Sequence, residues 1–234
     1  MKVLVIGDEH TYGYGLSTGN LSYIGHFIRQ IGRAGRAVSV EAYAHLTMAQ
    51  TIYTLAQLPL NRYDLIILQL DYTLIQGSSS QLAGSPRILI PVLPDLAHSP
   101  KPTAQPTFGS HIRAIGKALR SFVLPPQDLS PVSLLLNQLK PYRHNVLLLT
   151  PFSHQQVLSR WMRKRSRAVL LREAERRLIS VFDTDSVIHP REEYFLPNDN
   201  EHLSSISHEL LGRSLFDFYQ SAPTIVTIQA IRRE

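Results

Sequence analysis

The stretch VLVIGDEHTYGYG, residues 3–15, decides both the expected fold and the candidate site. An apolar run ends in Gly7 and Asp8, and a short polar loop with two more glycines follows it. α/β enzymes present a nucleophile in this way, because ligands bind beyond the carboxyl ends of parallel strands. The position after Asp8, where a serine is expected, holds Glu9. The stretch therefore predicts a site at the end of the first strand in which the usual chemistry is altered or lost.

Short apolar runs along the chain predict five strands, at 2–6, 37–43, 64–70, 145–150 and 179–183. Helical patterns separate or follow these runs, at 20–32, 47–58, 107–122, 131–140, 155–177 and 204–220. The strand runs are continuous rather than alternating, which is typical of parallel strands covered on both faces. The alternation of strand and helix favours an α/β fold, with an open parallel sheet, helices on both sides and right-handed crossovers.

Length and composition limit the class of protein. The 234 residues fit one domain, 1–234, without an internal repeat or a linker. The absence of cysteine excludes a disulfide framework, a thiolate metal site and a cysteine nucleophile. The apolar runs are too short to cross a bilayer, and no leader pattern precedes the first strand, so we expect a cytoplasmic protein without a membrane partner. Segment 77–106, with six prolines, is a long irregular excursion that either overhangs the site or forms a surface loop.

The net charge is +6, and much of it lies in 160–177, which carries eight Lys or Arg against two Glu. Apolar residues recur there at helical spacing, which predicts a helix whose arginines face solvent. The positions expected to face the core are Val157, Trp161, Ala168, Leu171, Ala174 and Leu178. No recognised nucleic-acid motif accompanies the charge, so we expect a solvated helix face and no nucleic-acid partner.

Polar residues follow three of the predicted strands, and a fourth segment returns to the same edge. They are Asp8, Glu9 and His10 after the first strand, Asp71, Tyr72 and Thr73 after the third, and Thr150, Pro151, Phe152 and Ser153 after the fourth. The loop and helix start at 195–212 add Asp199 and His202. Their spacing lets the Asp199 carboxylate accept the Nδ1–H of His202, so that Nε2 faces the crevice. The alternative is that Asp199 only caps a turn and that His202 is a polar residue at a helix start.

These motifs stand in the order found in the SGNH/GDSL hydrolases, and the chain resembles that family over nearly its whole length. The shared features are GD at 7–8 with a loop glycine at 13, YDLIILQL at 63–70, VFDTDSV at 181–187 and DNEHLS at 199–204. The resemblance implies a flavodoxin-like, three-layer α/β/α sandwich with a five-stranded parallel sheet. The family hydrolyses acyl, carbohydrate or lipid esters.

In that family a serine attacks the ester carbonyl, and a histidine oriented by an aspartate takes its proton. By resemblance, Asp199 and His202 match the aspartate and the histidine, whereas Glu9 occupies the serine position. A carboxylate beside an imidazole favours the imidazolium, and a protonated histidine is a poor general base. We therefore expect Glu9 to lie within salt-bridge reach of His202 Nε2 and serine-type hydrolysis to be lost or much reduced.

The resemblance also implies an altered oxyanion hole, which the family builds from the serine N–H, a glycine N–H and an asparagine side chain. Ala44 or His45 stands where the glycine is expected, and Thr73 replaces the asparagine. The remaining residues expected to line the pocket are Asp8, His10, Asp71 and Ser153.

Three functions stay open at this point. The first is an SGNH-like protein that has lost most hydrolase activity and binds a ligand or partner. The second is an active hydrolase in which Glu9 or His202 activates water, or in which Ser153 replaces the missing serine. The third is a metal site built from the acidic and histidine side chains Asp8, Glu9, His10, Asp199 and His202, whose spacing gives little support. We favour the first, with a small-molecule ester or another ligand as partner and with no cofactor or metal.

Overall fold

The structure is a computed structural model that describes residues 1–71, 75, 130–152, 157–197, 199 and 201–221. Several predictions lie outside the described residues, namely the excursion at 77–106, the helix at 107–122, Tyr72, Thr73, Ser153 and the side chain of Val157.

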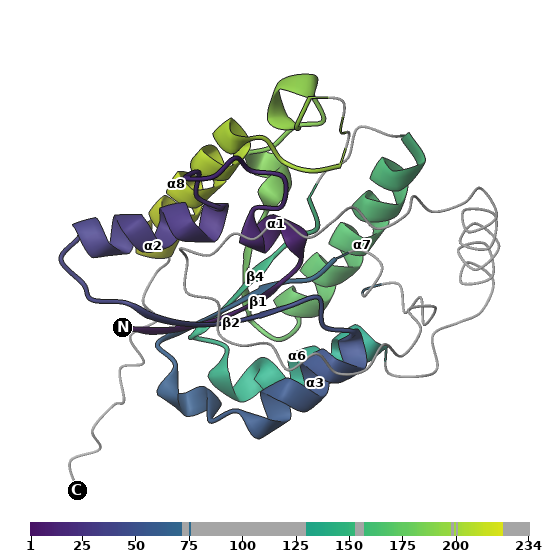
Figure 1. The fold of residues 1–234 in the computed structure, drawn as a ribbon. Coiled ribbons are helices and arrows are strands. Elements are labelled where there is room, and N and C mark those ends of the chain that lie inside the picture. The colour runs from purple at the N-terminus through teal and green to yellow at the C-terminus, as the bar shows by residue number, and fades with distance from the viewer. Residues whose placement is uncertain (72–74, 76–129, 153–156, 198, 200, 222–234) are drawn as a thin grey trace, which may run out of the picture.

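Five parallel strands form one sheet, in the order β2-β1-β3-β4-β5 (Figure 1). The strands are β1 (Lys2–Gly7), β2 (Ser39–Ala44), β3 (Leu65–Gln69), β4 (Val146–Leu149) and β5 (Ser180–Phe182). The predicted five-stranded parallel sheet is confirmed. The register pairs Gly7 with Ala44 and Ile6 with Leu68, so β1, β2 and β3 end at the same edge.

The described helices connect or follow the strands, and several of them begin at a capping side chain. They are α1 (Glu9–Tyr12), α2 (Tyr23–Arg33), α3 (Met48–Gln57), α6 (Pro131–Leu139), α7 (Val157–Glu175) and α8 (Ser205–Ser221). Short 3-10 helices occur at η1 (Leu60–Arg62), η2 (Lys140–Tyr142), η3 (Thr184–Ser186) and η4 (Glu192–Tyr194). Ser22, Thr47 and Ser130 each accept a backbone N–H from the first turn of α2, α3 and α6. Of these described helices, none combines the length and apolar composition that a bilayer crossing requires.

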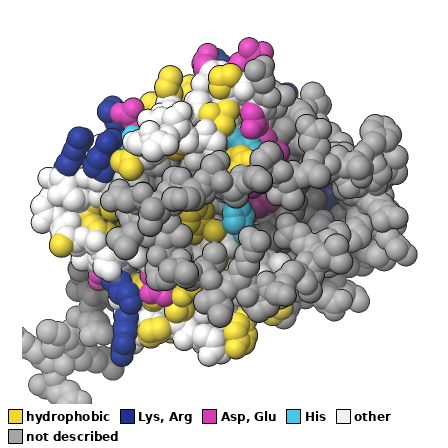
Figure 2. Space-filling view, in the orientation of Figure 1, with side chains coloured by type: hydrophobic (Ala, Val, Ile, Leu, Met, Phe, Trp, Pro, Cys, Tyr) yellow, Lys and Arg dark blue, Asp and Glu magenta, His cyan; other side chains and the backbone are white. Residues whose placement is uncertain are grey.

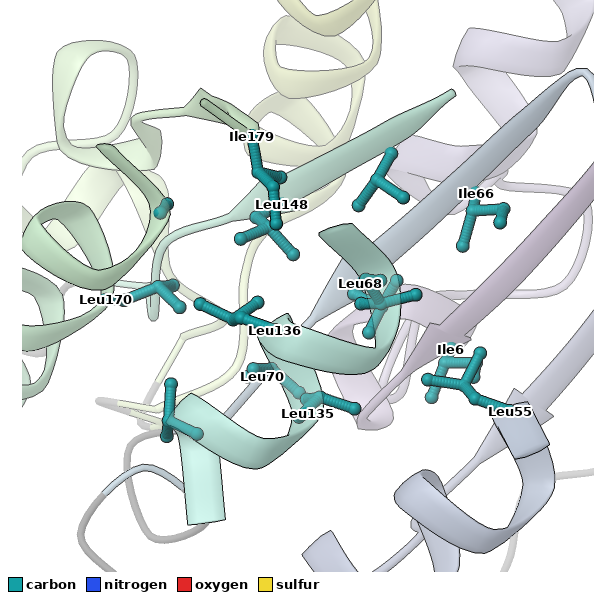
Figure 3. Close-up of a cluster of buried hydrophobic side chains, with 14 of the residues drawn as sticks. Ile6, Leu55, Ile66, Leu68, Leu70, Leu135, Leu136, Leu148, Leu170 and Ile179 are labelled. Atoms are coloured by element: carbon teal, nitrogen blue, oxygen red, sulfur yellow. The ribbon is translucent and has the colours of Figure 1, made fainter. Parts of the chain in front are cut away.

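Helices cover both faces of the sheet and so form three layers (Figure 1). Ile6 and Leu68 point into the core beneath α3, α6 and α7, whereas their neighbours Val5 and Ile67 point into the core beneath α2 and α8. Figure 3 shows the first core, in which Leu135 of α6 packs among the strand side chains. Because both faces are covered, every strand position can be apolar, which explains the continuous runs in the sequence.

The packing of α2 against α8 depends on one glycine. A Cβ built on Gly212 of α8 would lie 2.4 Å from the His26 Cβ and 2.7 Å from the Tyr23 carbonyl oxygen, both on α2. The Tyr23 N–H also donates to Nδ1 of His208 over 3.1 Å. N–H groups in the first turn of a helix have no partner within it, so His208 satisfies one of those of α2. Since α8 begins just after the loop that carries His202, this interface fixes the position of that loop.

The face of α7 that packs on the core differs from the prediction. Ala174 is buried and Leu171 half-buried as expected, but Ala168 is exposed and Trp161 is 46% exposed. Leu178 lies beyond the end of the helix and is 73% exposed. The buried side chains are Met162, Arg163, Ser166, Leu170, Glu173 and Ala174. Because half of these are polar or charged, counting apolar residues alone misplaces the buried face by roughly 140° at ~100° per residue. The prediction of solvent-facing arginines is therefore wrong for Arg163.

Candidate functional site

The turn after β1 positions Asp8 and Glu9 at the edge of the sheet. Position 7 has room only for glycine, because a Cβ there would lie 2.0 Å from Thr11 Oγ1. Asp8 caps α1, since its Oδ1 accepts a backbone N–H of the first turn over 2.9 Å. The Asp8 N–H donates to Gln69 Oε1 over 3.0 Å, and Gln69 Nε2 donates to Asp8 Oδ2 over 2.8 Å. Asp8 therefore braces β1 against β3 and fixes the direction in which Glu9 leaves the sheet.

His202 and Asp199 form the pair that the D-x-x-H spacing predicts. His202 Nδ1 lies 2.6 Å from Asp199 Oδ2, while Asp199 Oδ1 accepts the backbone N–H groups of Glu201 at 2.9 Å and His202 at 3.0 Å. The two readings of the motif are therefore compatible, because one carboxylate oxygen caps the turn and the other orients the imidazole. This arrangement leaves Nε2 as the histidine atom that meets the rest of the site.

Glu9 meets that atom. Its Oε1 lies 3.7 Å from His202 Nε2, so the expected contact is present. The contact with His202 lowers the pKa of Glu9 and outweighs the opposing effect of burial. Burial lowers the pKa of His202, but its contact with Glu9 and its hydrogen bond to Asp199 more than compensate, and the net shift is upward. The imidazole of His202 is thus held between two carboxylates that favour its protonated form.

His10 lies beside His202, and the pKa of its imidazole is also raised. It is 3% exposed, and its ring stacks on that of His202 at 5.8 Å between centroids. Its Nε2 donates to the Glu201 carbonyl oxygen over 3.0 Å, and its Nδ1 lies 3.4 Å from Asp8 Oδ1. Burial lowers the pKa of His10, yet the charge of Asp8 prevails and raises the pKa to about 9. His10 therefore carries a proton at neutral pH.

A cleft of about 240 Å³ opens at the strand ends beside these groups. Its lining consists of Ile6, Gly7, Asp8, Glu9, His10, His45, Leu46, Thr51, Gln69, Leu70, Asp71, Arg163 and Glu201. In Figure 2, histidine and acidic side chains lie next to one another near the centre of the face that is drawn. The predicted pocket residues Asp8, His10 and Asp71 therefore line the cleft.

Several lining residues were not predicted from the sequence, among them Gln69 and Arg163. Gln69 reads as part of the apolar β3 run, and only its hydrogen bonds to Asp8 reveal its role. Arg163 is 5% exposed, donating from Nη1 to the Phe152 carbonyl oxygen over 2.9 Å and from Nη2 to Glu201 Oε1 over 3.3 Å. A buried arginine in a basic helix gives no signal in the sequence, because its partners lie on other segments.

The oxyanion positions are only partly described. Ala44 ends β2 and is buried, whereas His45 has φ = 53°, a backbone conformation that favours glycine. Of Ala44 and His45, the two candidates for the oxyanion glycine position, His45 thus has the glycine-like backbone. Its N–H donates to the Gly7 carbonyl oxygen over 3.1 Å, so this group is engaged in the sheet. Thr73, at the asparagine position, lies outside the described residues.

The metal hypothesis receives no geometric support among the residues the structure describes. Asp8, Glu9, His10, Asp199 and His202 all reach this edge, but no three His, Asp or Glu side chains of the described ranges are placed to hold one ion. They pair with one another instead, as carboxylate with imidazole.

No protein-family model matches the chain, and no curated protein sequence does so either. Solved structures with the same fold do exist. The lipase Lip_vut3 from a goat rumen metagenome is 16% identical with a TM-score of 0.58, and the match covers 92% of this chain and 95% of the lipase. A member of the lipolytic protein G-D-S-L family from Veillonella parvula is 10% identical with a TM-score of 0.56, over 94% of this chain and 99% of that one.

A catalytic mutant of Axe2, an acetylxylan esterase from Geobacillus stearothermophilus, is 15% identical with a TM-score of 0.56, over 92% of each chain. The likeness extends along nearly the full length in all three proteins, while the identity stays low. The chain therefore has the three-layer α/β/α fold of the SGNH/GDSL lipases and esterases.

Proposed function

We propose that this chain is an SGNH-hydrolase-like protein that has lost serine-type ester hydrolysis and uses its cleft to bind a small-molecule ligand. One observation carries the proposal. The Glu9 carboxylate lies 3.7 Å from His202 Nε2, the atom that accepts the nucleophile's proton in a Ser–His–Asp triad. The position that needs a neutral hydroxyl therefore holds a carboxylate, and this carboxylate raises the pKa of the histidine that needs to act as a base.

The other parts of the ester-hydrolysis machinery agree with this proposal. Attack of Glu9 on an acyl group would produce an anhydride and would require an oxyanion hole to stabilise the tetrahedral intermediate. The His45 N–H is engaged by the Gly7 carbonyl, and a threonine replaces the asparagine donor at position 73. The cleft itself persists, with charged and amide side chains in its lining, which suits a small polar ligand.

The proposal is tested by restoring the nucleophile. Wild-type protein should hydrolyse 4-nitrophenyl acetate and octanoate no faster than background. Glu9→Ser returns the hydroxyl and removes the charge that raises the pKa of His202, so slow hydrolysis should appear. Adding Thr73→Asn should raise turnover further by about 10²–10³-fold, which is the usual effect of one oxyanion donor.

The matched control is Glu175→Ser, which makes the same chemical change at an exposed position at the end of α7. It should stay at background in the same assay. Brisk hydrolysis by wild-type protein would refute the loss of activity. A folded double variant without any hydrolysis would place the defect in the pocket and not at position 9.

A further inference from the structure

A second hollow lies at the opposite edge of the sheet from the candidate cleft. It is a groove of about 790 Å³ at the amino ends of β3, β4 and β5, whose first residues Leu65, Val146 and Ser180 line it. The N-terminus marks this edge in Figure 1. Ligands of open α/β sheets usually bind at the carboxyl ends of the strands, so this groove is independent of the proposed function. We infer that it binds a long-chain fatty acid as its carboxylate, with the acyl chain along the groove and the carboxylate at two arginines of the rim.

The floor of the groove is apolar and well packed. Ile31, Leu65 and Leu147 line it, and all three are buried members of the core beneath α2 and α8. These side chains are held from behind by the rest of that core. The groove therefore offers apolar surface to a ligand without rearrangement, as preformed ligand sites do.

The last two turns of α8 add aromatic side chains to the lining. Phe216, Phe218 and Tyr219 line the groove, and each of them is only half-buried. Each ring also packs edge to face on another ring. The centroid of Phe27 lies 6.5 Å from that of Phe216 and 5.8 Å from that of Tyr219, and Phe182 lies 5.5 Å from Phe218. Because these contacts fix the rings before a ligand arrives, binding loses little side-chain entropy.

Leu178 lines the same groove in an unfavourable conformation. It follows the end of α7, where its N–H donates to the Glu175 carbonyl oxygen over 3.0 Å. Its φ is 55°, in the left-handed region where helix ends usually carry glycine. The side chain is also 73% exposed. A leucine here costs free energy in the backbone and in exposed apolar surface, and an acyl chain that covers it recovers part of this cost.

The rim of the groove carries an excess of positive charge. Arg36 and Arg143 line it, and neither guanidinium has a hydrogen bond or an ion pair in the part of the chain that the structure describes. Asp64 is the acidic residue among the described lining residues, and its Oδ2 already accepts the Lys2 N–H over 2.7 Å. A guanidinium binds a carboxylate through two parallel N–H groups. The rim is therefore complementary to an anionic head group.

The backbone at the groove favours a ligand without peptide groups. The Asp64 N–H donates to the Lys2 carbonyl oxygen over 2.9 Å, and the Asn145 N–H donates to that of Tyr142 over 2.8 Å. The Asn145 carbonyl oxygen accepts the Ile66 N–H over 2.7 Å. A polypeptide would thus find these backbone groups already engaged, although its own N–H and C=O groups need partners. An acyl chain needs none, and its single polar group meets the arginines.

Isothermal titration calorimetry with dodecanoate, below its micelle concentration, tests the inference. Wild-type protein should bind one dodecanoate per chain in a saturable manner. Each methylene removed from the acyl chain should weaken binding by about 4-fold, the effect of one buried CH₂ group. Dodecanol, which has the same chain without the charge, should bind about 10-fold more weakly or less. Absence of saturable dodecanoate binding would refute the inference.

The double variant Arg36→Gln with Arg143→Gln tests the rim. It should weaken dodecanoate by about 10-fold or more and leave dodecanol unchanged, since only the carboxylate meets the arginines. The matched control is Arg62→Gln with Arg172→Gln, which removes the same charge from exposed positions outside the groove lining. This control should bind as wild type. Equal weakening of dodecanoate in both double variants would mean that net charge attracts the anion, and the rim would have no specific role.

Leu178→Asn tests the apolar part of the groove. Asparagine tolerates the left-handed conformation, so the end of α7 should be preserved. Because both ligands use the apolar surface, dodecanoate and dodecanol should each bind about 5-fold more weakly or less. Unchanged binding of both ligands would contradict a site that includes Leu178.

NMR chemical shifts of the backbone amides locate the ligand. Dodecanoate should shift the signals of Leu178, Ser180 and Gln220, all of which line the groove. Shifts confined to the residues around Glu9 would place the fatty acid in the cleft, which would refute this inference and leave the proposed function standing. Because the two sites lie at opposite edges of the sheet, the nitrophenyl ester assay decides the proposed function separately.

Two other occupants of the groove would also overturn the inference. A wild-type dimer in sedimentation velocity that Leu178→Asn dissociates would assign the groove to a second copy of the chain. Residues 222–234 follow Gln220 and Ser221 and lie outside the described residues. Dodecanoate binding that appears only in the full-length variant Ile228→Asp would assign the groove to that segment.

Discussion

Gly212→Ala tests the helix contact that holds the site together. The new Cβ would lie 2.4 Å from the His26 Cβ and 2.7 Å from the Tyr23 carbonyl oxygen, and 3.2 Å from the Phe27 nitrogen. Two of these atoms belong to the backbone of α2, so a rotamer change cannot relieve the contact and the helices have to move apart. Overpacking of this kind costs about 1–3 kcal/mol, and rigid neighbours favour the upper end.

Alanine also has a higher helix propensity than glycine, which offsets up to ~1 kcal/mol of that cost. The net expectation for Gly212→Ala is a loss of ~2 kcal/mol in the free energy of unfolding. The control is Gly32→Ala on α2, where a new Cβ would meet nothing within 4 Å, and it should stabilise by ~0.5–1 kcal/mol.

Urea denaturation followed by circular dichroism measures both variants, with an unchanged m-value showing that the same surface unfolds. Gly212→Ala at or above wild-type stability would refute the reasoning, since it would mean that α2 and α8 do not pack at this distance. Because α8 begins just after the loop with His202, the same variant should also perturb the NMR signals of that imidazole.

Three further predictions follow from the charges. Glu9→Gln should lower the pKa of His202, because it removes a carboxylate 3.7 Å from Nε2, and an unchanged imidazole titration in NMR would contradict this. Burial lowers the pKa of His208 to about 3, so between pH ~6.5 and 3 the imidazole takes up a proton only in the unfolded state. The free energy of unfolding should therefore fall as the pH drops through this range, by up to ~1.4 kcal/mol per pH unit. His208→Asn should flatten this pH dependence in urea titrations. Arg163→Glu should lower the free energy of unfolding by about 3–5 kcal/mol, because Arg163 is 5% exposed and paired with Glu201. The control is Lys164→Glu on the exposed side of α7, which should change the free energy of unfolding by no more than ~0.5 kcal/mol in the same titrations.

The sheet was predictable because its signal is local and repeated. The central strands place neighbours such as Val5 and Ile6 in two different cores, so most of their positions are apolar and the run stands out in the sequence. The short helix α1 was not predicted, since its four residues are too few to show a period and its start depends on the Asp8 cap.

The candidate site was predictable only where its contacts are short in sequence. Asp199 and His202 are three residues apart, so their spacing alone suggested the pair. Glu9 and His202 lie near opposite ends of the sequence, so their contact could be predicted only from the family resemblance. The buried role of Arg163 could not be predicted, because helical periodicity was counted from apolar residues and its partners at Phe152 and Glu201 lie outside the helix.

The D-x-x-H motif does not by itself state which chemistry a chain performs. The same Asp199–His202 geometry holds the imidazole ready as a base or as an acid, and the neighbouring group decides between the two. A serine leaves the imidazole neutral near pH 7, so it accepts a proton and activates the hydroxyl. A glutamate favours the imidazolium and raises the pKa of the histidine, so the histidine is a poorer base. The residue after Gly7-Asp8 thus determines how readily the histidine accepts a proton from a nucleophile, although the fold around it is unchanged.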